Sequence, residues 1–156
     1  MKESLPVSIR VKDKVYDLDY ERELKCSEET INDDLKSQAP LFAWHAVMQE
    51  LAEADLADAK LLLEMTEAAL DEKYRVALAK EGKVTETLIG HKVKLDEEYQ
   101  TAISVFNECR KNVGVLKAIK DAFGHRKDCL ISLASNMRAQ QDPDIYIKKL
   151  EFKNPK

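Results

Sequence analysis

Basic side chains gather in a stretch whose apolar spacing is otherwise that of a core-forming helix. The stretch AFGHRKDCLISLASNMRAQ, residues 122–140, contains His125, Arg126, Lys127 and Arg138. Bases at helical spacing can hold the phosphates of a polyanion. They can equally be the solvated flank of a helix, with their stems covering apolar surface. Charge alone leaves both interpretations open.

Most of these bases share one side of the predicted helix. Projected at about 100° per residue, five of them fall within an arc of about 100°: Arg110, Lys117, Lys120, Lys127 and Arg138. Arg126 falls instead near Ile119 and Leu133. A guanidinium in apolar surroundings must meet a carboxylate or a phosphate, or line a wet channel.

Other reactive residues form no recognisable catalytic or metal-binding arrangement. Cys26, Cys109 and Cys129 have no C-x-x-C spacing, and the three histidines are scattered. No phosphate-binding glycine motif and no G-x-S-x-G occurs. We therefore expect no enzyme activity, no metal and no cofactor.

Composition predicts one soluble helical domain. The 156 residues include only four Gly and four Pro, and 35% are charged. No apolar run is long enough to span a membrane, and no signal peptide is evident, so we expect a cytoplasmic protein. Residues 1–107 contain 14 Lys and Arg against 23 Asp and Glu, whereas residues 108–156 contain 11 against 6, giving the net charge of −4. The bases thus concentrate toward the C-terminus.

The chain divides into three predicted regions. Residues 1–26 form an acidic segment with one or two strands. If there are two, they can pair as a hairpin whose turn lies at Lys12-Asp13. Residues 27–141 form the helical core, and residues 142–156 form a tail with a candidate strand, DIYIKKLEF. Within the core we expect a short helix from Ser27 that ends before Pro40, and a long one from Leu41 to about Lys80. A connector restarts at Thr85, and Asp96 caps a last helix from Glu97 to about Gln140.

The last helix has the clearest apolar repeat. Steps of three and four from Tyr99 reach Cys109, Leu116, Phe123 and Leu130, a coiled-coil-like seam. The fold class is therefore mainly α, a long antiparallel helical hairpin with short β segments at the termini. Because Leu116, Phe123 and Leu130 exceed what a two-helix contact covers, we expect the hairpin to assemble as a homo-oligomer.

These features resemble a known family. The middle stretch APLFAWHAVMQELAEADLADAKLLLEMTEAALDEKYR with its early Trp44, and the closing stretch LKAIKDAFGHRKDCLISLASNMR, look like the UvsY-type recombination mediators of bacteriophages. The likeness covers about residues 31–138 and includes the Lys-x-Arg at Lys73 and Arg75. The N-terminal strands and the tail are outside the family pattern.

The resemblance implies a function in DNA recombination and repair. Such mediators are all-helical, form ring-like oligomers, bind single-stranded DNA (ssDNA), and help a RecA-like recombinase load onto strands covered by an ssDNA-binding protein. The family's Lys-x-Arg motif binds DNA, and by position the resemblance assigns the same role to Lys73 and Arg75. With these, the candidate DNA-binding residues are Lys73, Arg75, Arg110, Lys117, Lys120, Arg126, Lys127 and Arg138, and the candidate core or oligomer residues are Trp44, Leu116, Phe123 and Leu130.

One alternative function remains open. A helical homo-oligomeric scaffold or assembly chaperone with no nucleic-acid role would use the same charge asymmetry for contacts between subunits. Lys120 and Lys127 would then pair with acids such as Glu64, Glu67 or Asp71.

Overall fold

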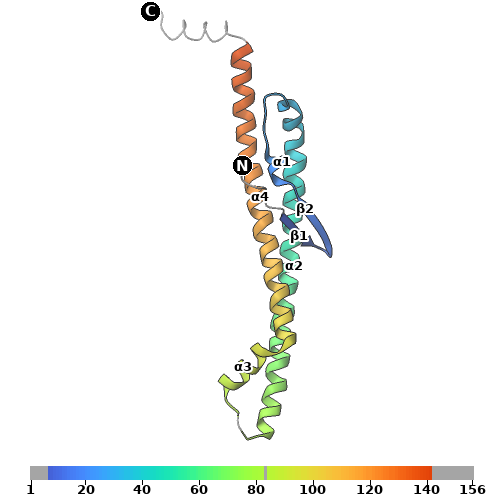
Figure 1. Cartoon of the computed structure of the whole chain (residues 1–156), viewed down its shortest axis with the longest axis vertical. Helices are drawn as coiled ribbons and strands as arrows, with labels where there is room; N and C mark the ends of the chain where they lie inside the picture. The colour runs from blue at the N-terminus through green and yellow to red at the C-terminus, as the bar shows by residue number, and fades with distance from the viewer. Residues whose placement is uncertain (1–6, 83, 142–156) are drawn as a thin grey trace, which may run out of the picture. The chain divides into compact units, whose positions relative to one another are not determined.

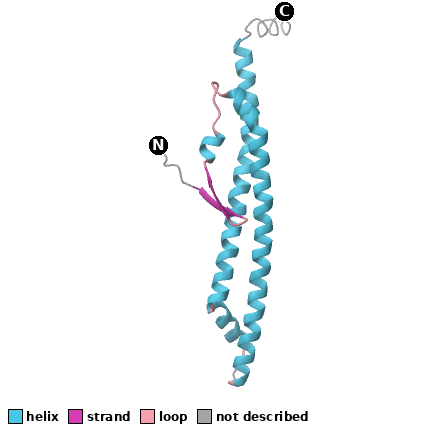
Figure 2. Cartoon of the chain, turned by 90° about the vertical axis from the view of Figure 1, so that its right-hand side faces the viewer, coloured by secondary structure: helices cyan, strands magenta, loops and turns pink. Residues whose placement is uncertain are grey.

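The computed structural model describes residues 7–82 and 84–141, and it is mainly helical (Figures 1 and 2). Its elements are β1 (Val7–Val11), β2 (Lys14–Leu18), α1 (Tyr20–Leu24), α2 (Ile31–Lys80), α3 (Glu86–Leu95) and α4 (Glu97–Gln141). The described residues form two compact units. Unit 1 comprises residue 7 with 18–46 and 118–141, and unit 2 comprises 8–17 and 47–117. In each unit, segments of α2 and α4 pack together in opposite directions (Figure 1).

The predicted N-terminal strands are confirmed as a two-stranded hairpin. Lys12 and Asp13 form its two-residue loop, and both have positive φ (48° and 62°), as the twist of a tight hairpin requires. Asp55 of α2 stabilises this loop: its carboxylate accepts the Lys12 backbone N–H at 2.8 Å and lies 2.7 Å from the Lys12 ammonium. On the strands, Ile9 and Val11 are buried.

The predicted break before Pro40 is wrong, because α2 is continuous from Ile31 to Lys80 with Pro40 inside it. Proline lacks the N–H that would bond to the carbonyl of Lys36. Lys36 and Pro40 are both exposed, so water can reach that carbonyl. The preceding turns are held by tertiary contacts: Gln38 bonds to the backbone of α4, and Asp34 pairs with Arg126. These contacts override the local preference against helix.

The predicted turns around α3 agree with the structure. Gly82 follows α2 with φ +72°, a backbone conformation that favours glycine. The Thr85 hydroxyl caps α3 by accepting the Leu88 N–H at 3.3 Å. Asp96 both ends α3 and caps α4, where its side chain accepts the Glu98 N–H at 2.9 Å. The predicted C-terminal strand lies outside the described residues.

In unit 2, α3 folds back onto α2 through an apolar cluster. Leu70 and Leu78 of α2 pack with Ile89 and Val93 of α3, and each is at most 3% exposed. Tyr74, Leu88 and Tyr99 pack around them. Because α3 brings its own apolar face, the C-terminal part of α2 has a core that α4 alone would not supply.

The predicted excess of apolar surface is wrong for three of the α4 residues on which it was based. Leu116, Phe123 and Leu130 are each 0% exposed within the single chain. In unit 1 the ring of His45 covers Phe123, stacked at 4.7 Å. Trp44, in contrast, is 40% exposed, so it is not a core residue of the single chain. A homo-oligomer cannot be argued from the α4 seam.

We predict that Pro40→Ala stabilises the protein. Proline inside a helix costs about 3 kcal/mol relative to alanine, which is opposed by about 1 kcal/mol of added freedom in the unfolded chain. The free energy of unfolding from urea denaturation should therefore rise by about 2 kcal/mol. A decrease would mean that the chain needs the proline to interrupt the helix.

Candidate nucleic-acid interface

The structure separates the candidate bases of α4 by burial. Arg110, Lys117, Lys127 and Arg138 are exposed, and Lys120 is half-buried. Arg126 is buried, with only 5% of its surface exposed. The α4 repeat therefore places one base inside unit 1 and leaves the others available to solvent.

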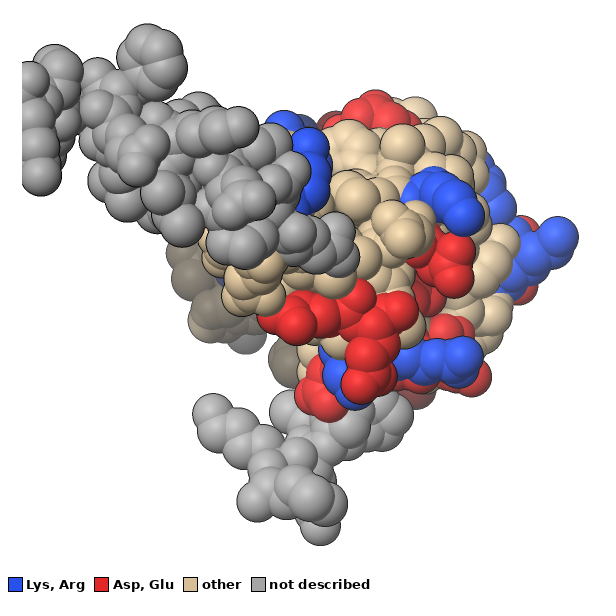
Figure 3. Space-filling view, turned by 90° about the horizontal axis from the view of Figure 1, so that it is seen from above, with Lys and Arg blue, Asp and Glu red and all other residues tan. Residues whose placement is uncertain are grey.

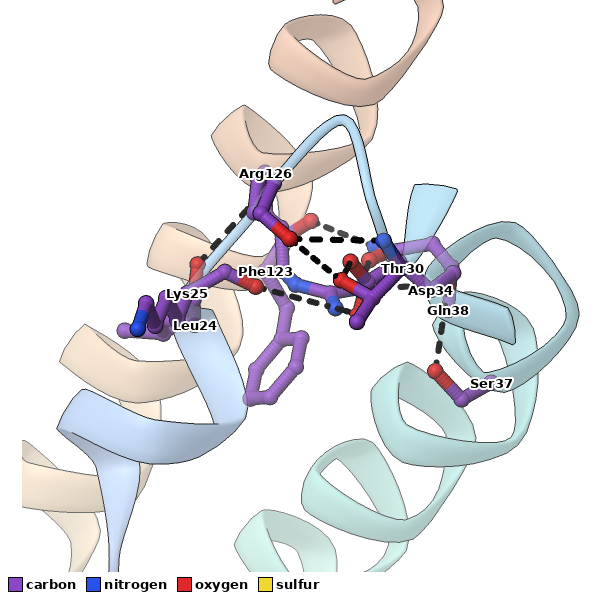
Figure 4. Close-up of polar contacts among 10 residues, drawn as sticks. Leu24, Lys25, Thr30, Asp34, Ser37, Gln38, Phe123 and Arg126 are labelled. Carbon is purple, nitrogen blue, oxygen red and sulfur yellow. Dashed lines mark hydrogen bonds and ion pairs between the residues drawn. The ribbon is translucent and has the colours of Figure 1, made fainter. Parts of the chain in front are cut away.

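Arg126 is held by α2 in a buried polar network (Figure 4). Its guanidinium donates to the Asp34 carboxylate at 2.8 Å and to the side-chain oxygen of Gln38 at 2.6 Å. Gln38 in turn donates to the backbone carbonyl of Phe123 at 2.7 Å. This is the carboxylate partner that a guanidinium in apolar surroundings requires.

The same guanidinium also reaches the backbone. It donates to the carbonyl oxygens of Asp34 at 3.3 Å and of Lys25 at 3.4 Å, and so it joins α4, α2 and the segment after α1. Burial beside this network raises the pKa of the Cys26 thiol, while the positive charge of Arg126 acts to lower it. Arg126 is thus a structural residue, and in this structure its buried guanidinium is not accessible to DNA.

The surroundings of Arg126 would also repel a phosphate. A cavity of about 310 Å³ beside it is lined by Asp19, Glu23 and Asp34, with Arg22 as the other base. Since these three carboxylates outnumber the one other basic side chain, Arg22, a DNA strand would meet net negative charge as it approached the cavity.

Lys73 and Arg75 also serve as structural bases, in unit 2. Arg75 donates to both oxygens of Glu86 (2.7 and 2.9 Å) and to Asp71 (3.1 Å), which raises the pKa of Arg75 and lowers that of Glu86. Lys73 lies 3.3 Å from Asp96, whose carboxylate also accepts the Tyr74 hydroxyl at 2.7 Å and has a lowered pKa. These pairs fasten α3 and the start of α4 to α2.

The exposed bases of α4 make fewer and weaker ion pairs and hydrogen bonds. Lys127 is 3.8 Å from Asp128, its sequence neighbour, and Arg138 donates to the carbonyl of Ala134 in its own helix at 3.1 Å. Within the described ranges, Arg110, Lys117 and Lys120 have no carboxylate within ion-pair distance. Their charges are therefore available to a ligand.

On the one face that Figure 3 draws, the charge is mixed rather than uniformly basic. Figure 3 shows Lys and Arg side chains interspersed with Asp and Glu on the face that it draws. Binding of a polyanion would depend on the local row of bases along α4 and not on a large positive field.

Sequence reasoning missed two polar contacts in the interior. His45 is fully buried, and its Nε2 lies 3.0 Å from a Glu23 oxygen, which ties α1 to α2. Asn112 is 2% exposed and donates to the backbone carbonyl of Arg10 at 2.8 Å, which ties β1 to α4 in unit 2. His45 lies one heptad before Ala52 on the buried stripe of α2, so the spacing of α2 could have predicted that His45 is buried. Nothing in the sequence pattern indicated that Glu23 would be its partner.

Comparison of the chain with protein-family models, with curated proteins and with solved structures finds no match. None of the helices in the described ranges is long and apolar enough to cross a membrane. Among these residues, no group of three or more His, Cys, Asp or Glu side chains is arranged to hold a metal ion.

We predict that Arg126→Met destabilises the protein by about 3–5 kcal/mol, because the substitution leaves the partly buried Asp34 without its counter-charge. Urea denaturation of Arg126→Met and of Lys127→Met gives the comparison, since the Lys127 side chain is 63% exposed. Lys127→Met should change stability by at most about 0.5 kcal/mol. Equal effects of the two substitutions would show that the Arg126 network contributes little.

Proposed function

We propose that the chain is an ssDNA-binding recombination mediator that holds DNA through the exposed bases of α4. The observation that carries the proposal is the row of bases whose charges are not consumed by the fold. Lys120, Lys127 and Arg138 form such a row in unit 1, and Arg110 and Lys117 form a separate pair of exposed bases in unit 2. Lys73, Arg75 and Arg126, committed to carboxylates, are left out of the proposed DNA contacts.

Binding of this kind would not depend on the base sequence. Lysine and arginine contacts to phosphate supply affinity without reading bases. Among the Phe, Tyr and Trp side chains of the described ranges, the one nearest in sequence to these bases is Phe123, which is fully buried and so cannot stack on a base. The expected ligand is any single strand, held with an affinity that falls steeply with salt.

The proposed role is mechanical. A homo-oligomer, a ring in the mediators that the sequence resembles, would repeat these bases and turn weak contacts into avidity. Holding the strand in a new path would loosen an ssDNA-binding protein and present the strand to a RecA-like recombinase. A phage-encoded protein of this kind would act in the cytoplasm of the host cell.

A helical scaffold or assembly chaperone is the second candidate. It is favoured by the ion pairs of Lys73 and Arg75, which give those two bases a purely structural use, and by the exposed apolar side chains of α2. A scaffold would need neither phosphate contacts nor salt-sensitive binding.

We predict that changing Lys120 and Lys127 together to Ala weakens binding to labelled oligo(dT). The slope of log K against log salt should shrink by about 0.7 for each lost phosphate contact. Fluorescence anisotropy at several salt concentrations measures both effects, and circular dichroism verifies that the helices remain.

The matched control is Lys36→Ala with Lys80→Ala, which removes the same charge from exposed positions of α2. The control should leave both affinity and salt slope unchanged. If the two double variants weaken binding equally, the row on α4 is not the DNA contact. If the Lys120 and Lys127 variant loses its assembly and keeps its DNA binding, the scaffold function is correct.

A further inference from the structure

A row of apolar side chains on α2 lies uncovered in unit 2. Leu61, Leu62 and Met65 are 57%, 52% and 61% exposed, and Val47 and Val76 are 58% and 48% exposed. Solvent exposure of several large aliphatic side chains on one short stretch is uncommon on a monomer and marks a contact surface.

The spacing of this row is that of a coiled-coil seam. Steps of four and three along α2 select eight positions, here called the outer seam: Val47, Leu51, Ala54, Asp58, Leu61, Met65, Ala68 and Glu72. Six of the eight are apolar, and the seam extends over about four heptads, the length at which a heptad pattern indicates a coiled coil.

The outer seam is distinct from the face that α2 buries in its own unit. The buried face is formed by Ala52, Ala59 and Leu70, which are at most 6% exposed. Projected at about 100° per residue, the two faces point roughly 140° apart. The helix therefore has one face that is covered within its unit and a second, apolar face that is exposed.

The charged positions of the seam indicate which partner fits. Two parallel copies would place Asp58 against Asp58 and Glu72 against Glu72, and like charges in a seam are unfavourable. In an antiparallel pair with Leu61 of one copy against Met65 of the other, Asp58 faces Ala68 and Glu72 faces Ala54. The carboxylates then pass over small side chains toward water.

The flanks are compatible with the same arrangement. Leu62 lies beside the seam, where a two-fold axis brings it near Leu62 of the second copy. On the other flank, the charge of Glu64 is already offset by Lys60 of its own helix, 3.8 Å away. From Ala54 to Glu72 the surface is thus complementary to itself, which a contact between identical subunits requires. In the same register Leu51 and Val47 face Arg75 and Ala79, which lie beyond the outer seam.

We propose that the outer seam of α2 is a homodimer interface, filled by the outer seam of a second copy in antiparallel orientation. The proposal names a subunit interface for the homo-oligomer of the proposed function. It does not depend on DNA binding, because the bases of α4 take no part in it.

Sedimentation equilibrium without DNA tests the interface. The wild-type chain should have a mass at least twice 17.8 kDa at micromolar concentration, and Met65→Glu should at least halve it. The control Ile131→Glu introduces the same charge at an α4 position that is 53% exposed, and it should leave the mass unchanged. A wild-type monomer, an unchanged mass in Met65→Glu, or an equal loss in both variants overturns the proposal.

Disulfide cross-linking tests the orientation of the two copies with variants that add no charge to the outer seam. Leu61→Cys and Met65→Cys are each placed in a Cys129→Ser background, since Cys129 is the exposed native cysteine. Under oxidation, a mixture of the two should form more disulfide-linked dimer than either alone. Stronger linking within either variant alone indicates parallel pairing and contradicts the proposal.

The two proposals fail separately. If the mass experiment fails while oligo(dT) still binds, only the interface is wrong. If the mass behaves as expected while oligo(dT) does not bind, the interface stands and the DNA-binding function is wrong.

Discussion

The buried guanidinium of Arg126 is the contact on which unit 1 depends. A charge that is 5% exposed persists only if it has partners, and here Asp34, Gln38 and two backbone carbonyls accept from its two terminal nitrogens, while its Nε has no partner among the described residues. The contact joins residues 92 positions apart in the chain. It fixes the first turns of α2 against α4, and with them the backbone that carries Pro40 within a helix.

The same principle sorts the other charges of the molecule. Ion pairs that connect elements, such as Arg75 with Glu86 and Lys12 with Asp55, use bases for folding. The exposed bases of α4 make no such connection in the described residues, and the large apolar side chains of the outer seam of α2 remain exposed in its unit. What the fold does not use is what remains for a ligand and for a second subunit. The proposed function and the proposed interface therefore lie on different helices.

Local patterns predicted the elements well, and long-range partners poorly. The hairpin about Lys12-Asp13, the restart of the chain at Thr85 and the Asp96 cap each follow from short-range backbone chemistry, and all were found where predicted. Pro40 was misread because its neighbours are held by contacts with α4. The need of Arg126 for a partner was predictable from its apolar surroundings. That the partner is Asp34 and not a phosphate was not, because no local pattern records a contact across 92 residues.

Lysine acetylation footprinting, read by mass spectrometry with and without oligo(dT), tests the central claim most directly, since it reports the exposure of each ammonium group in the intact chain. We expect the strand to protect Lys117, Lys120 and Lys127 from acetylation. Lys73, which is held by Asp96, and Lys60, an exposed residue of α2, should react as they do without DNA. Protection of Lys73 with continued reaction of Lys120 and Lys127 would contradict it.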